Sequence, residues 1–225
     1  MHIAVLCCLS LLGSCAVWLY LARMDSNDCQ VEKEMPFTLA LKPKGKRLAF
    51  LLCMETVLIG ISVWLEYTYR TNLLIDNAEI ICLLLLLFAA ANIDMRKQII
   101  PNTLLLAGLI IRLILWIIAL ILDVNRFLNV VGGEALSCVG FGVFLILGAV
   151  LTRGGIGMGD VKLIMLMALY QGFYGVISSL FFSLFAAFII AITLLIARKK
   201  GKKDAIAFAP SILVGTLLSV FLTGM

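Results

Sequence analysis

Two aspartates, Asp94 and Asp160, are the residues of this sequence whose type and setting best suit chemistry. Asp94 ends an apolar run in "FAAANIDMRKQIIPN", and Asp160 precedes another in "GGIGMGDVKL". An ionisable group in such surroundings needs either a partner or a function. Two close carboxylates cannot both ionise cheaply, so one keeps a proton while the other acts as a base. This pattern favours activation of a water molecule against a peptide carbonyl.

The sequence lacks the residues that other common catalytic mechanisms require. The sole histidine, His2, excludes a zinc-binding H-E-x-x-H helix and a serine–histidine–aspartate triad. There is no G-x-S-x-G turn and no phosphate-binding G-x-x-x-x-G-K-[ST] loop. The seven cysteines include no C-x-x-C pair, which argues against a zinc site. We therefore expect neither a metal nor a cofactor.

The glycines before Asp160 favour a sharp turn into a helix. They stand at positions 154, 155, 157 and 159, and glycine adopts backbone angles that other residues avoid and allows close approach of another chain. We expect Asp160 at the N-cap of the following helix. Pro101, followed by Asn102, is typical of a loop that opens a helix.

The elements that position these residues are predicted to be transmembrane helices. Hydrophobic residues make up 63% of the chain, charged residues 14%, and the mean hydropathy is +1.14, too apolar for a soluble globule. Continuous apolar runs favour an all-α, polytopic transmembrane bundle over a barrel. About eight spans are expected, near 3–22, 48–67, 79–94, 103–122, 133–151, 161–172, 173–197 and 205–223.

The basic residues predict the orientation of these spans. Fifteen of the eighteen lysines and arginines fall in alternate loops, which the positive-inside rule assigns to the cytoplasm. Both termini are then outside, and Asp94 and Asp160, separated by two spans, share the cytoplasmic side. Membrane lipids, and not nucleic acid, are the partners that this charge pattern indicates. The predicted location is the inner cell membrane, with the active site facing the cytoplasm.

Two motifs contain these residues: Asp94 with Ile100-Pro101-Asn102, and Gly157-Met158-Gly159-Asp160-Val161-Lys162-Leu163. Together they resemble the paired signature motifs of the type IV prepilin peptidases. The resemblance covers roughly residues 48–225, the predicted peptidase core, and leaves 1–47 as a first helix with a basic cytoplasmic loop. It implies that Asp94 and Asp160 are the catalytic pair of an aspartic endopeptidase. The implied substrate is a type IV prepilin or pseudopilin, whose leader is cut at the cytoplasmic face. Residues implied in substrate binding or in shaping loops are Pro101, Asn102, Gly157, Gly159, Lys162 and Pro210.

The sequence departs from that family at two places. Bifunctional members carry paired C-x-x-C motifs after the first span, whereas the corresponding loop here has only Cys29. The resemblance is therefore to the form without the methyltransferase segment. The family's P-F-G-P turn reads Ala207-Phe208-Ala209-Pro210 in this chain, which puts the shape of that turn in question.

Two other functions remain open from the sequence. A presenilin-like intramembrane protease shares G-x-G-D, although Ile93 replaces the usual tyrosine before the first aspartate. A small secondary transporter with an intramembrane carboxylate site would also use a broken helix and paired acids. Among the remaining charges, Glu55 and Arg112 are predicted to lie at similar depths and to pair, and Glu134 is predicted to be a solvated or capping residue.

Overall fold

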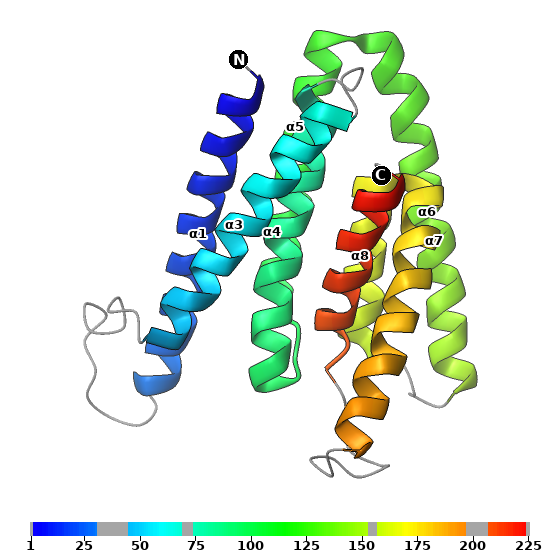
Figure 1. Ribbon diagram of the computed structural model, residues 1–225. Helices are drawn as coiled ribbons and strands as arrows, with labels where there is room; N and C mark the ends of the chain where they lie inside the picture. The colour runs from blue at the N-terminus through cyan, green and yellow to red at the C-terminus, as the bar shows by residue number, and fades with distance from the viewer. Residues whose placement is uncertain (1, 31–44, 69–73, 153–156, 197–206, 224–225) are drawn as a thin grey trace. The chain divides into compact units, whose positions relative to one another are not determined.

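The computed structural model describes residues 2–30, 45–68, 74–152, 157–196 and 207–223. Within these ranges the chain is all helical, as predicted, and contains no strand. Figure 1 shows the helices α1 (His2–Gln30), α3 (Gly45–Thr68), α4 (Leu74–Lys97), α5 (Asn102–Leu122), α6 (Val124–Leu151), α7 (Met158–Ile196) and α8 (Ala209–Thr223). Gly154, Gly155 and much of the basic loops, 31–44 and 197–206, lie outside the described residues.

The protein is a multi-pass membrane protein. Five of the described helices, α1, α4, α5, α6 and α7, are long and apolar enough to cross a bilayer, and α8 is a shorter apolar helix. The apolar runs thus predicted a helical membrane bundle correctly. The number of eight spans and the outside location of both termini stay predictions.

The helix α7 is broken at Gly172. This residue has φ +64°, a left-handed conformation that glycine adopts readily, and its neighbours on both sides are helical. The hydroxyl of Ser179 donates to Gln171 Oε1 at 3.0 Å across the break, whereas eight residues of continuous helix would separate their backbones by about 12 Å. The boundary predicted between runs 161–172 and 173–197 therefore coincides with a real change of direction.

By its internal contacts the chain divides into two units, residues 1–85 and 86–225, with the division inside α4. In the first unit α1 packs against α3. Ser14 on α1 donates to Glu55 Oε1 on α3 at 2.7 Å. The division predicted at residue 48 rests on the family resemblance and stays a prediction.

In the second unit α7 packs against both α6 and α8. The helices α7 and α8 approach each other closely at Gly215, where an added Cβ would lie 2.3 Å from the backbone nitrogen of Ser183. Tyr170 on α7 donates its hydroxyl proton to the Gly108 carbonyl on α5 at 2.7 Å. These contacts join α7 to α5 and to α8.

Arg112 is fully buried in the second unit and forms an ion pair with Glu134 of α6. Trp116 donates its indole N–H to the other oxygen of Glu134 at 2.8 Å, and the Arg112 guanidinium lies 5.2 Å from the ring centre of Tyr170. In the second unit Arg112 therefore pairs with Glu134, and its predicted pairing with Glu55 of the first unit stays a prediction.

The prediction that Glu134 is solvated or capping was wrong, because only 6% of its surface is exposed. The apolar run placed the start of this helix near residue 133, whereas α6 begins at Val124. The polar residues of "VNRFLN" are helical as well. Glu134 thus lies well inside α6, where a buried charge requires the partner that Arg112 supplies.

Candidate active site

Asp94 lies in the last turn of α4 and is buried, with 6% of its surface exposed. The helix ends at Lys97. The next residue, Gln98, has φ +53° and donates its N–H to the Asp94 carbonyl at 2.9 Å. A left-handed residue after the last helical turn is a common way for a helix to stop. The chain then continues through Ile99 and Ile100 to α5.

The Asp94 carboxylate receives a backbone hydrogen bond from the beginning of α8. Its Oδ2 accepts the N–H of Ala209 at 2.9 Å. The first amides of a helix have no partner within the helix, and the dipole there favours a negative group. The next residue, Pro210, has no N–H to offer. The Asp94 side chain therefore caps α8 from a position 115 residues earlier in the chain.

Asp160 lies in the first turn of α7 and is half-buried. The helix starts at Met158, two residues before Asp160, so the expectation that Asp160 is the N-cap was wrong. Gly157 precedes the helix, and its carbonyl accepts the N–H of Val161 at 3.1 Å. A Cβ at Gly157 would lie 3.0 Å from Asp160 Oδ2. Gly157 therefore leaves room for the Asp160 carboxylate beside the backbone.

Gly159 allows the first turn of α7 to approach the segment between α4 and α5. A Cβ at this position would lie 3.2 Å from the Cβ of Ile100, which is itself buried. Pro101 follows as the N-cap of α5 in an extended conformation, and its carbonyl accepts the N–H of Leu104 at 3.1 Å. The glycine motif and the segment after Asp94 therefore pack together.

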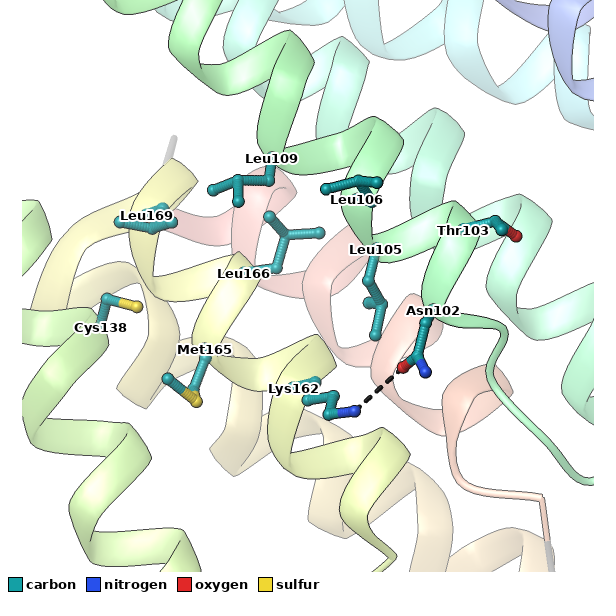
Figure 2. A pocket seen from close by; sticks show the side chains of 10 residues that line it. All are labelled: Asn102, Thr103, Leu105, Leu106, Leu109, Cys138, Lys162, Met165, Leu166 and Leu169. Carbon is teal, nitrogen blue, oxygen red and sulfur yellow. Dashed lines mark hydrogen bonds between the residues drawn. The ribbon is translucent and has the colours of Figure 1, made fainter.

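Lys162 and Asn102 join the beginnings of α7 and α5. The Lys162 ammonium donates to Asn102 Oδ1 at 3.0 Å, and both side chains are exposed (Figure 2). Residues 160 and 162 are two positions apart on a helix, which corresponds to about 200° around its axis. The ammonium thus points away from the side of α7 that carries Asp160.

Asp94 and Asp160 belong to segments that pack together, because Gly159 lies beside Ile100, between α4 and α5. They come from different helices and are separated by 66 residues in the sequence. Two carboxyl groups that lie close together can share one proton. Such a pair can activate a water molecule with one member and donate a hydrogen bond with the other.

Nothing in the described ranges groups three or more histidine, cysteine, aspartate or glutamate side chains as a metal site would. The residue that sequence reasoning missed is Ala209, whose contribution is a backbone amide and not a side chain. A signal was present in the neighbouring Pro210, because proline is frequent in the first turn of a helix, where free amides are found.

The model of one protein family, the type IV leader peptidase family, matches residues 81–193. The match includes both aspartates and the glycine motif, and it ends before α8. Comparison with curated proteins gives no match, and neither does comparison with solved structures.

Proposed function

Because the chain belongs to the type IV leader peptidase family, we propose that it is a membrane aspartic endopeptidase with Asp94 and Asp160 as its catalytic pair. The substrate is a type IV prepilin-like or pseudopilin precursor. The reaction removes the precursor's leader peptide at the cytoplasmic face of the cell membrane.

The observation that carries this proposal is the packing of Gly159, which precedes Asp160, against Ile100 in the segment that follows Asp94. Each aspartate also lies beside backbone that fits it closely: the amide of Ala209 in one case and Gly157 in the other. A structural role for both carboxylates would not require their two segments to meet. A shared proton, in contrast, requires such proximity.

In the proposed reaction a water molecule binds between the two carboxyl groups. The ionised aspartate takes a proton from this water as its oxygen attacks the scissile carbonyl carbon. The protonated aspartate donates a hydrogen bond to the carbonyl oxygen, which becomes negatively charged. When the tetrahedral intermediate collapses, the C–N bond breaks and a proton passes to the leaving amine. No covalent intermediate is formed.

The surrounding groups orient the two carboxyls for this reaction. The Ala209 N–H holds Oδ2 of Asp94 and thereby fixes the plane of that carboxylate. Gly157 and Gly159 let the turn that bears Asp160 pack against Ile100 and leave its carboxyl accessible. An error of about 1 Å in such an arrangement costs about 100-fold in rate, so these backbone contacts are expected to matter for catalysis.

The cytoplasmic location is supported by the distribution of basic residues in the predicted loops. The leader of a prepilin is short and basic and precedes an apolar helix, so the bond to be cut lies at the membrane surface. Asp94 lies in the last turn of α4, and Asp160 lies in the first turn of α7. Both aspartates are therefore at helix ends, as a site at the membrane surface requires.

The test is a cleavage assay with a co-expressed prepilin-like substrate. Asp94→Asn and Asp160→Asn should each reduce cleavage below detection, because an amide cannot exchange a proton as a carboxyl does. The side-chain amide introduced by Asp94→Asn still offers a carbonyl oxygen to the Ala209 N–H, so the fold should survive. Asp123→Asn, at the exposed residue between α5 and α6, is the matched control and should cleave normally. Full cleavage by either of the first two variants would remove that aspartate from the mechanism.

A further inference from the structure

A groove lies on the surface of the second unit between α5, α6 and α7. It has a volume of about 520 Å³, within the range of roughly 300–1,000 Å³ that small-molecule sites occupy. Figure 2 shows its walls, which include Leu106 and Leu109 of α5, Cys138 of α6 and Leu166 and Leu169 of α7. We call this site the α5–α7 groove.

One end of the α5–α7 groove is polar and positively charged. Lys162 and Asn102 line it there and are hydrogen-bonded to each other. An ammonium has three N–H donors, and one of them is directed to Asn102. Because Asp160 lies on the other side of α7, its charge does not face the groove. The groove therefore combines an apolar wall with a cation at one end.

We propose that the α5–α7 groove binds an anionic phospholipid of the membrane, with one acyl chain along the leucines and the phosphate at Lys162. This inference is independent of the peptidase proposal. An apolar groove with a single cation at its rim complements a molecule with a hydrocarbon chain and a single negative headgroup.

The position of the groove in the membrane supports this occupant. Leu106 is 57% exposed and Leu109 is 37% exposed on a helix long and apolar enough to span the bilayer. Lys162 is the fifth residue of α7, near the end of its apolar stretch. The leucines thus lie at the depth of acyl chains and the ammonium near the depth of headgroups.

The lipid would connect two parts of the candidate active site. Its phosphate binds next to Asn102, which follows Pro101, and Lys162, which is in the same helical turn as Asp160. Its chain packs against both α5 and α7. A bound lipid therefore stabilises the relative position of these two helix starts.

The experiment is native mass spectrometry of the full chain, titrated with phosphatidylglycerol or phosphatidylcholine of identical acyl chains. The unaltered protein should bind phosphatidylglycerol about fivefold more tightly, the effect of one lysine near an anionic headgroup. Lys162→Gln should abolish this preference. Leu109→Trp, which fills the groove, should weaken binding of both lipids by about tenfold or more, since each buried methylene contributes about fourfold.

The control is Ile114→Trp, an exposed residue farther along α5 that does not line the groove, which should bind both lipids normally. The proposal is overturned if Lys162→Gln keeps the preference or if Leu109→Trp behaves as the control does. It is also overturned if Leu109→Trp impairs binding of a prepilin-like peptide while lipid binding is unchanged, since the groove would then hold substrate. Lys162 is exposed, so its variant decides the question even if Leu109→Trp does not fold.

Discussion

The carboxylate of Asp94 accepts the backbone N–H of Ala209 at 2.9 Å and so connects the end of α4 to the beginning of α8. The hydrogen bond fixes one oxygen of the proposed catalytic pair. It also gives a hydrogen-bond acceptor to an N–H in the first turn of α8 that has none within the helix.

Ala209→Pro should impair cleavage strongly while α8 still forms. Proline suits the first position of a helix but has no N–H, so the hydrogen bond to Asp94 is lost. A hydrogen bond to a charged group contributes about 1.5–3 kcal/mol, which corresponds to roughly 10- to 100-fold in rate. Initial cleavage rates of a prepilin-like substrate measure the effect. Ala209→Gly retains the N–H and should cleave nearly normally; equal loss in both variants would show that the amide is not the reason.

Gly157→Ala should lower activity because of crowding beside Asp160. The new Cβ would lie 3.0 Å from Asp160 Oδ2, so the carboxyl or the turn must shift. The required shift is a few tenths of an ångström, so the expected loss is smaller than the roughly 100-fold that a displacement of about 1 Å costs. The matched control is Gly140→Ala in α6, where an added Cβ meets nothing within 4 Å. Cleavage by Gly157→Ala at the rate of this control would contradict the prediction.

Gly215→Ala should destabilise the packing of α7 against α8. The added Cβ would lie 2.3 Å from the Ser183 backbone nitrogen, and backbone cannot move aside as a flexible side chain does. Overpacking of this kind costs about 1–3 kcal/mol. Thermal unfolding in detergent measures it, with Gly132→Ala, which has open space around its Cβ, as the comparison. An unchanged melting temperature for Gly215→Ala would mean that the two helices separate easily.

Arg112→Met should destabilise the protein because it leaves Glu134 buried without its ion-pair partner. Removal of one member of a buried pair typically costs about 3–5 kcal/mol. Replacing both, in Arg112→Met/Glu134→Gln, should recover much of this loss, since a neutral glutamine can still accept the Trp116 N–H. Equilibrium unfolding in mixed micelles compares the three proteins. If the double variant is as unstable as Arg112→Met, the charge of Glu134 is not the cause.

The apolar runs predicted most of the helices, because hydrocarbon length and helix length are coupled in a membrane. The run 103–122 agrees with α5 within one residue, and the division at 172/173 agrees with the break at Gly172. The start of α6 was missed by nine residues. Hydropathy indicates which residues lie within the bilayer, whereas backbone hydrogen bonds determine where a helix begins. The polar turns before Gly132 are therefore helical although they are not part of the apolar run.

The candidate site was predictable only in its side chains. Asp94 and Asp160 stand out as carboxylates in apolar surroundings, and the resemblance of their motifs to one family is specific. The match of that family's model over residues 81–193 confirms the resemblance. The partner of Asp94 is a main-chain amide of alanine. Pro210 indicates that a helix with free amides begins there, but it does not indicate which carboxylate those amides meet. Glu134 was missed as the partner of Arg112 because the predicted start of α6, near residue 133, placed Glu134 at the end of the helix.

The hydrogen bond from α8 has a consequence for shortened forms of this protein. A chain cut after residue 193 would keep the whole segment that defines the family, with both acids and every motif glycine. It would nevertheless lack the amide that orients Asp94. Completeness of the motifs is therefore a poor guide to where an expression fragment can end, and the last helix belongs in any version meant to be active.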